Sequence, residues 1–204
     1  MVPGKWTGLL LNAAAPTEVL KILAGVEDRY NRTQTLQVAF SESFTMQNRK
    51  RTQRGELYLR KPGRMRWEYT SPSGQLVIAD GKYIYSYFPS EQRAERESFK
   101  ETEDMRAPLA FLLGKLHFHD DFREFRTDPD HDNVLITAIP KSDKLPYSSV
   151  TFLVSPDSTI HYLKVTSQDG SIIEFTFENE RKNPPLNDSL FKFTPPPGVE
   201  YDPH

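Results

Sequence analysis

The amino-acid sequence predicts a mainly β fold with a helical lid (α+β): an incomplete, half-open antiparallel β-barrel of about ten or eleven strands covered by short helices. Two observations predict it. From Leu36 onward, apolar residues alternate with polar ones along many short runs. Turn residues such as Asp80-Gly81 and Gln168-Asp169-Gly170 separate these runs. Strands do not alternate with long helices, which disfavours a parallel sheet.

Composition limits the number of domains and the class of partner. At 204 residues and 23.5 kDa, the chain can form one domain with a large core or a cavity. Its 26 basic and 28 acidic residues give a net charge of -2, so we expect no nucleic acid partner. The absence of cysteine excludes disulfides and thiolate metal sites. No apolar run approaches the roughly 20 residues of a membrane-spanning helix.

Residues 1–16 are interpreted as a leader or signal remnant and are expected to be flexible. Lys5 precedes a short apolar run, and the alanines at 13–15 supply the small residues found before a cleavage site. Asn12 interrupts the run, so a worn signal and an ordinary disordered or tag-derived leader remain equally good interpretations. Residues 17–204 are expected to form a single domain.

An amphipathic helix is predicted over residues 17–32. Thr17 suits the N-cap position, and the apolar residues that follow recur at three- and four-residue spacing. The stripe consists of Val19, Leu20, Ile22, Leu23, Val26 and Tyr30. Such a stripe needs a partner surface, so we expect this helix to lie over the sheet.

Strands are predicted for the rest of the chain, with short turns between them. They cover residues 36–40, 57–59, 65–69, 75–79, 83–87, 93–99, 122–126, 134–139, 149–154, 160–167 and 172–179. A second helix is predicted over 108–114, because Pro108 suits a first turn and Gly114 suits a helix end. A brief turn or helix is expected near residue 188, followed by a rigid extended tail.

The search for catalytic motifs is negative. The patterns of serine hydrolases, nucleotide-binding loops and zinc peptidases are all missing. Only His117 and His119, with the carboxylates of Asp120 and Asp121 after them and His131 nearby, have the side chains of a metal site. No known ligand spacing is met, so the preferred interpretation is a solvated loop, and we expect neither a metal nor another cofactor.

The strands that flank the Pro62-Gly63 turn carry an apolar face and basic residues. The apolar side chains are ordinary core or the wall of a cavity, since a strongly curved sheet encloses more volume than short helices fill. Arg64 and Arg66 are interpreted as a solvated outer face. Arg60 and Lys61 end a strand beside the mouth of the sheet and are better binding candidates.

Four segments together resemble the LolA-type periplasmic carriers of outer-membrane lipoproteins. They are Gly55–Pro72 (GELYLRKPGRMRWEYTSP), Val77–Pro89 (VIADGKYIYSYFP), Ala107–Leu113 (APLAFLL) and Phe191–Val199 (FKFTPPPGV). Each segment alone is weak, but their order and spacing match from about residue 17 to 200.

The resemblance implies a non-enzymatic, cofactor-free carrier that acts in the periplasm as a monomer. It would receive lipoproteins from an inner-membrane LolCDE-type ABC transporter and deliver them to a LolB-type outer-membrane receptor where one is present. Their acyl chains would occupy a cavity under a helical lid. The residues assigned to that cavity are Leu20, Leu23, Val38, Phe40, Leu57, Leu59, Met65, Trp67, Tyr69 and Ile78, with Leu109, Phe111, Leu112 and Leu113 from the lid.

This sequence departs from the family at the residue before the turn proline. The resemblance implies an arginine there that helps to hold the lid closed, whereas this chain has Lys61 with Arg60 beside it. Lysine lacks the planar fork of arginine, so the latch is expected to be weaker or to have moved to Arg60.

Two alternative functions remain open. The first is a LolA-like periplasmic binder or sensor of another lipid or glycolipid. The second, which the sequence favours least, is a metal-dependent hydrolase centred on His117 and His119.

Overall fold

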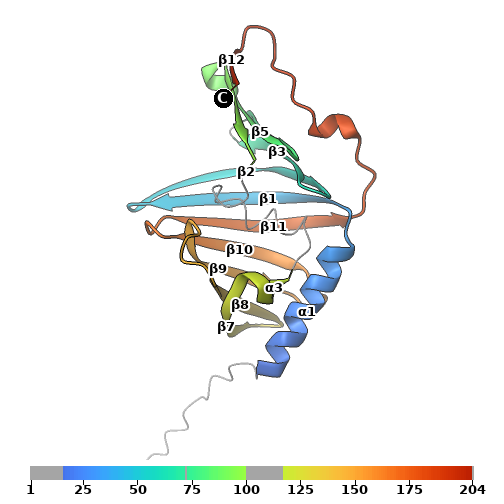
Figure 1. The fold of residues 1–204 in the computed structure, drawn as a ribbon, viewed down its shortest axis with the longest axis vertical. Coiled ribbons are helices and arrows are strands. Elements are labelled where there is room, and N and C mark those ends of the chain that lie inside the picture. Colours follow the sequence, from blue (N-terminus) through green and yellow to red (C-terminus); the bar gives the residue numbers. More distant parts are fainter. Residues whose placement is uncertain (1–15, 72, 100–116, 204) are drawn as a thin grey trace, which may run out of the picture.

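One unclosed sheet of twelve strands dominates the computed structural model, which describes residues 16–71, 73–99 and 117–203 (Figure 1). The strand order is β12-β6-β5-β4-β3-β2-β1-β11-β10-β9-β8-β7. The strands are β1 (Thr35–Met46), β2 (Arg49–Arg60), β3 (Arg64–Ser71), β4 (Ser73–Asp80), β5 (Tyr83–Phe88), β6 (Arg93–Ser98), β7 (Phe122–Asp130), β8 (Asn133–Pro140), β9 (Tyr147–Val154), β10 (Ile160–Ser167), β11 (Ile172–Lys182) and β12 (Glu200–Pro203). The helical elements are α1 (Pro16–Arg32), α3 (Phe118–Asp121), and the 3-10 turns η1 (Pro89–Glu91) and η3 (Asp188–Phe191).

The predicted mainly β architecture is confirmed, and each predicted strand is present. The helix predicted over 17–32 is α1, and the turn expected near residue 188 is η3. The sequence missed β12, which pairs with β6 and forms a parallel pair in a sheet that is otherwise antiparallel. A four-residue strand after a proline run carries no alternation that could reveal it. The predicted leader up to residue 15 and the helix predicted over 108–114 lie outside the described residues.

The pairing of β1 with both β2 and β11 joins the two halves of the sheet. β1 runs beside β2 in unbroken register from Thr35, opposite Arg60, to Met46, opposite Arg49. Its other edge pairs with β11, the last of the long strands. Because β1 and β11 are far apart in sequence, this contact places the first and last thirds of the chain side by side at the centre of the sheet.

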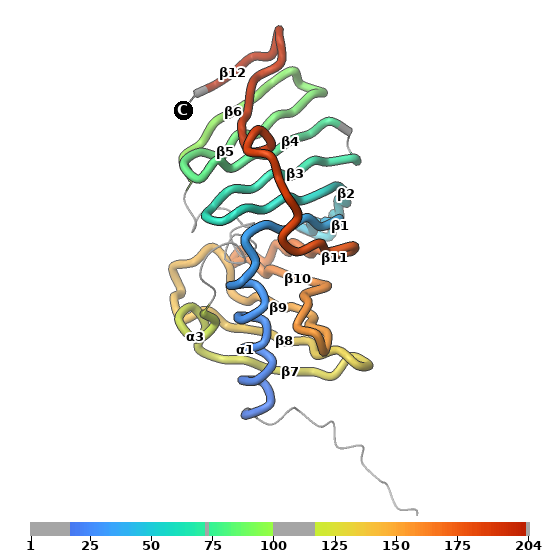
Figure 2. Tube along the Cα trace, turned by 90° about the vertical axis from the view of Figure 1, so that its right-hand side faces the viewer, coloured from blue at the N-terminus to red at the C-terminus, as the bar shows by residue number. Residues whose placement is uncertain are grey.

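α1 lies beside the half of the sheet formed by β7 to β11 (Figure 1 and Figure 2). Leu23, Val26 and Tyr30, at the spacing of one helical face, are almost fully buried in the main apolar cluster. Burying a large apolar side chain stabilises a fold by about 1.5–3 kcal/mol. The apolar face therefore supplies most of the energy that holds α1 against the sheet.

Gly55 allows β1, β2 and β3 to approach closely in the middle of the sheet. It pairs with Phe40 on one side and Tyr69 on the other. A Cβ atom at this position would lie 2.0 Å from the backbone oxygen of Glu68 and 2.9 Å from the Phe40 ring. Neither a backbone oxygen nor a packed ring can move away cheaply, so only glycine fits.

We expect Gly55→Ala to lower the free energy of unfolding by about 3 kcal/mol, the upper range for overpacking a core. Urea denaturation followed by circular dichroism measures it. Gly25→Ala is the matched control, because its Cβ would meet only the movable Ser158 hydroxyl, at 2.5 Å. That variant should stay within about 1 kcal/mol of the native protein, helped by the helix propensity of alanine. Equal effects of the two substitutions would contradict this explanation of Gly55.

Candidate functional site

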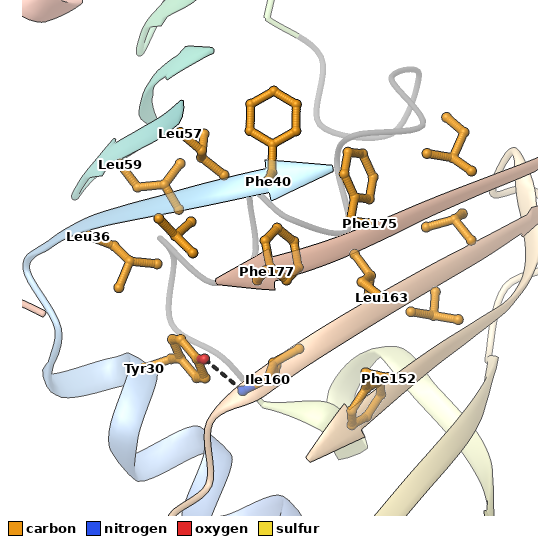
Figure 3. Packing of buried hydrophobic residues seen from close by; sticks show 14 of the residues in the cluster. Tyr30, Leu36, Phe40, Leu57, Leu59, Phe152, Ile160, Leu163, Phe175 and Phe177 are labelled. Carbon is orange, nitrogen blue, oxygen red and sulfur yellow. Dashed lines mark hydrogen bonds between the residues drawn. The ribbon is translucent and has the colours of Figure 1, made fainter. Parts of the chain in front are cut away.

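The apolar face predicted from the first strands exists as one surface. Cross-strand pairing aligns Val38 with Leu57 and Leu57 with Trp67, and the adjacent register aligns Leu59 with Met65. These side chains are buried and belong to one apolar cluster, which Figure 3 shows in part. The structure also brings Leu23, Phe40 and Tyr69 into this cluster.

Strands from the second half of the chain complete this face, and the sequence analysis did not assign them to the site. Phe152, Leu163, Phe175 and Phe177 are buried in the same cluster (Figure 3). The alternation of Ile173, Phe175 and Phe177 was visible in the sequence. It could not show that β11 pairs with β1, and that long-range contact places these rings beside the first strands.

Aromatic rings form the centre of the apolar face. Phe40 meets Trp67 edge-on at 4.9 Å between centroids, and Trp67 lies 5.5 Å from Phe175. Phe175 in turn stacks on Phe177 at 6.0 Å. Within the described part of the chain, the buried indole Nε1 of Trp67 has no hydrogen-bond partner. An unpaired donor in an apolar site is costly, so an acceptor brought by a ligand would be favoured there.

A small cavity lies between α1 and the central strands. Its volume is about 10 Å³, close to the minimum that holds one water molecule. It is lined by Tyr30, Leu36, Val38, Leu57, Leu59, Ile160, Phe177 and Glu180. Tyr30 of α1 is part of this lining, so little free space separates the end of the helix from these strands.

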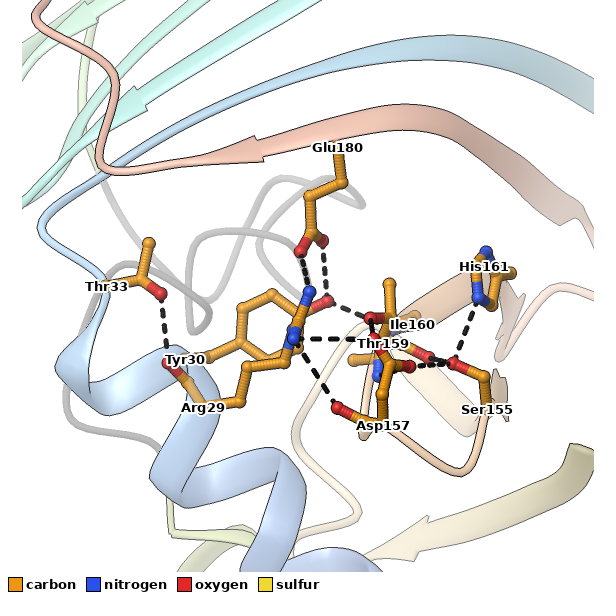
Figure 4. A network of polar contacts seen from close by, with 9 residues as sticks. All are labelled: Arg29, Tyr30, Thr33, Ser155, Asp157, Thr159, Ile160, His161 and Glu180. Carbon is orange, nitrogen blue, oxygen red and sulfur yellow. Dashed lines mark hydrogen bonds and ion pairs between the residues drawn. The ribbon is translucent and has the colours of Figure 1, made fainter.

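A polar network fastens the last turns of α1 to β11 and β10 (Figure 4). Glu180 accepts hydrogen bonds from Arg29 Nη2 at 2.6 Å and from the Tyr30 hydroxyl at 2.8 Å. The backbone N–H of Ile160 donates to the same hydroxyl at 3.0 Å. Burial, and then the negative charge of Glu180, raise the pKa of Tyr30. The phenol therefore stays protonated and donates its hydrogen to the carboxylate.

A bulge in β11 aims Glu180 at α1. Phe177 already faces the cavity, so strict alternation would point Glu180 to the opposite side. The register with β1 shifts between Gln37 and Ala39, and Asn179 adopts a left-handed φ of 57°. The extra residue reverses the alternation and re-aims the following side chain.

Asp157, in the turn between β9 and β10, extends this network through its contact with Arg29. Its carboxylate accepts hydrogen bonds from the Ser155 hydroxyl at 2.5 Å and the Thr159 hydroxyl at 2.8 Å. Arg29 Nη1 lies 3.7 Å from it. The hydroxyl donors, aided by Arg29, lower the pKa of Asp157 to about 2. The side chain is therefore an anion at neutral pH and attracts the guanidinium that Glu180 binds from the other side.

Lys61 binds the end of α1 from the opposite direction. Its ammonium donates to the backbone oxygens of Tyr30 at 2.9 Å and Asn31 at 2.7 Å. These carbonyls belong to the last turn, where helix oxygens lack partners and the dipole attracts a cation. Burial lowers the pKa of Lys61. The residue before the turn proline thus contacts α1 directly.

Arg60 points away from α1. It pairs with Asp188 and donates to the backbone oxygen of Leu186, and its guanidinium lies 5.4 Å from the centre of the Phe191 ring. These groups lie in and beside η3, which packs on the outer face of β3 and β4. Arg60 therefore fastens the C-terminal segment and is not placed to take over the contact that Lys61 makes.

Three assignments from the sequence differ from the structure. Leu20 is 47% exposed, because it lies at the edge of the α1 stripe and faces solvent. Ile78 is buried on the outer face, since it pairs with Arg66 while its neighbours Val77 and Ala79 pair with residues of the apolar face.

The third assignment concerns Arg66, which is not solvated: its side chain is 18% exposed and bonds to Glu68 and to the Leu190 oxygen. By contrast, the Arg64 side chain is 41% exposed.

The histidines do not gather into a metal site. Among the described residues, no group of three or more histidine, aspartate or glutamate side chains could hold a metal ion. His117 lies 4.0 Å from Glu27, and His119 packs edge-on against Phe125. His131 contacts Asp130 in a separate turn. Leu109, Phe111, Leu112 and Leu113 lie outside the described residues.

The family model described as outer membrane lipoprotein carrier protein LolA matches residues 31–194. The chain belongs to the LolA family. Its similarity to individual members is distant but extends over nearly their full length. The outer-membrane lipoprotein carrier protein of Chromobacterium violaceum is 25% identical over 187 residues, which cover 92% of this chain and 89% of the relative. That of Salmonella paratyphi A is 24% identical over 196 residues, with 95% and 94% covered.

A solved structure shares the fold of this LolA-family chain. An uncharacterized conserved protein from Thermus thermophilus superposes with a TM-score of 0.55 at 10% identity, covering 92% of this chain and 99% of that one. At this identity, the likeness concerns the fold alone. Among the described helices, none has the length and apolar character to cross a membrane.

We expect Glu180→Ala to lower the free energy of unfolding by about 3 kcal/mol, because it leaves the partly buried Arg29 and the buried Tyr30 without their shared acceptor. Chemical denaturation measures the change. Glu178→Ala, two residues earlier on β11, is the control: its side chain is exposed and should matter by about 0.5 kcal/mol or less. A loss at Glu180 no larger than at Glu178 would show that the network does not hold α1.

Proposed function

We propose that this LolA-family protein carries outer-membrane lipoproteins by sheltering their acyl chains against the apolar face of its sheet. The observation that carries the proposal is this face itself, with aromatic rings at its centre and a helix fastened over part of it by polar contacts. Membership of the LolA family supports the choice of ligand. Binding alone is the activity, so neither a cofactor nor a bond-breaking step is required.

Acyl chains gain enough energy from burial to be held in water. Each buried methylene contributes about 0.8 kcal/mol, so partial burial of a long chain is sufficient. The cavity of about 10 Å³ beside Tyr30 is far too small for one. Loading at this end therefore requires α1 to move. The unpaired Nε1 of Trp67 would then be a donor for an ester or amide oxygen of the lipid.

The polar anchors of α1 would set how tightly the cargo is held. A site that opens only part of the time binds with an affinity reduced by the open fraction. Lys61 and Glu180 favour the closed state from two sides, so they limit affinity and allow the cargo to leave. We assign Lys61 the latch role that the family gives to arginine.

The carrier would work in the periplasm as a monomeric domain of residues 17–204. It would take lipoproteins from a LolCDE-type ABC transporter of the inner membrane and pass them to a LolB-type receptor of the outer membrane. Passage in this direction needs no energy source in the carrier, provided that the receptor binds the acyl chains more tightly.

A triacylated peptide should bind in a ratio of one to one and change the fluorescence of Trp67. The chain has two tryptophans, so Trp6→Phe leaves Trp67 as the sole reporter. Native mass spectrometry measures the stoichiometry, and the same peptide without acyl chains is the control. No response to the acylated peptide would refute lipoprotein carriage. A different lipid retained by the purified protein would instead favour the binder or sensor of another lipid.

Lys61→Ala should raise the apparent affinity for the triacylated peptide about fivefold. The loss of about 1 kcal/mol from the closed state increases the open fraction by that factor. Arg60→Ala is the matched control, because Arg60 binds η3 on the outer face and should leave the affinity unchanged. An increase caused by Arg60→Ala and not by Lys61→Ala would move the latch to Arg60.

A further inference from the structure

The hairpin of β1 and β2 projects beyond its neighbour β3. Pairing between β2 and β3 begins only at Arg54, opposite Ser71, so residues 49–53 pair with no described strand on that side. Gln47 and Asn48 form the turn, with φ angles of 47° and 63° that suit a two-residue hairpin loop. Figure 1 shows this turn at the end of the sheet away from α1. We name residues 46–54 the basic tip.

The basic tip carries positive charge against the balance of the chain. Arg49, Lys50, Arg51 and Arg54 are four of the 26 basic residues, and the stretch from 43 to 55 holds none of the 28 acidic ones. The rest of the chain therefore has 22 basic and 28 acidic residues, a net charge of -6. An anionic surface would attract this hairpin while it repels most of the remaining molecule, which orients the approach.

The cations of the basic tip are available for an external partner. All four side chains are exposed. Within the described part of the chain, only Lys50 has an ion pair, a long contact of 3.9 Å with Glu174. Asp169 lies in the adjacent turn between β10 and β11. Its carboxylate accepts hydrogen bonds from the backbone N–H and the hydroxyl of Ser171, so its contacts lie within its own turn. Among the residues that the structure describes, Arg49, Arg51 and Arg54 have no ion pair that would have to break before they meet a new anion.

Met46 adds an apolar contact beside the turn. It pairs with Arg49 across the hairpin and is 46% exposed. With Leu20, it is one of two large hydrophobic side chains that are exposed in the described part of the chain. A flexible thioether flanked by cations is suited to the boundary between lipid headgroups and acyl chains.

We propose that the basic tip binds the surface of a bilayer that contains anionic phospholipids. Arg49, Lys50 and Arg51 contact lipid phosphates, and Met46 enters the interfacial layer. Successive strand residues point to opposite faces, so these cations surround the hairpin. A fluid anionic surface approached tip-first can satisfy both faces, whereas an acidic protein docked on one face would engage only half of them. The inference does not depend on which cargo the protein carries.

Flotation of the cargo-free protein with vesicles tests this inference. Binding is expected to vesicles of phosphatidylglycerol and phosphatidylethanolamine, not to phosphatidylcholine, and to weaken as salt screens the charges. Each cation near an anionic bilayer strengthens binding about fivefold. The variant Arg49→Gln, Lys50→Gln, Arg51→Gln should therefore lose on the order of 100-fold in affinity. Met46→Ser should weaken binding less, without altering its salt dependence.

The control variant removes three positive charges from the α1 end of the molecule instead of from the basic tip. Arg32→Gln, Arg181→Gln, Lys182→Gln changes three exposed cations and should lose far less affinity. Equal losses in both triple variants would overturn the proposal, because overall charge would then explain binding. Absence of binding by the native protein would also overturn it. Salt-sensitive binding of the tip to an acidic protein, without vesicle binding, would replace the bilayer by a protein partner.

Discussion

The attachment of the last turn of α1 to the centre of the sheet is the constraint on which the other features depend. β1 pairs with β2 on one edge and β11 on the other, so Lys61 after β2 and Glu180 on β11 reach the same helix end from two sides. This contact keeps Tyr30 packed on the apolar face, where each Å² of apolar surface kept from water contributes about 25 cal/mol. The rest of α1 is held by apolar packing, which has no preferred direction, and by a hydrogen bond of 2.7 Å from the backbone N–H of Phe118 to Glu27. The polar contacts therefore determine where the helix ends and how it sits.

This arrangement suits a protein that must bind an apolar ligand and also release it. An apolar site that stayed open would hold acyl chains tightly and would attract other apolar surfaces. A helix that fills the site when it is empty competes with the ligand, and the energy of closure is subtracted from the affinity. Hydrogen bonds to charged groups are suitable for this purpose, because they are directional and are lost together when the helix turns away. Lys61, a point donor, can follow small movements of the two carbonyls that it binds.

The fold keeps its three polar regions apart. The network around Glu180 acts on α1, whereas Arg60 fastens η3 on the outer face of the sheet. The basic tip projects at the end away from α1, and Lys50 alone among its cations has an ion pair within the described residues. Contact of the tip with a surface would leave α1 free to move. Electrostatic attraction at one end and apolar binding over the sheet can thus operate without blocking one another.

Local periodicity in the sequence determined the strands, α1 and most of the apolar face, because alternation with period two decides which side chains share a side. For this reason it predicted a shared side for Val38, Leu57 and Trp67, which the structure pairs in one buried cluster. Only the tertiary structure decided the rest. Ile78 lies in a continuous apolar run whose two faces are both covered, so period alone could not assign it. The inward direction of Glu180 depends on a bulge against β1. Registers and bulges come from contacts between segments distant in sequence, and no local pattern records them.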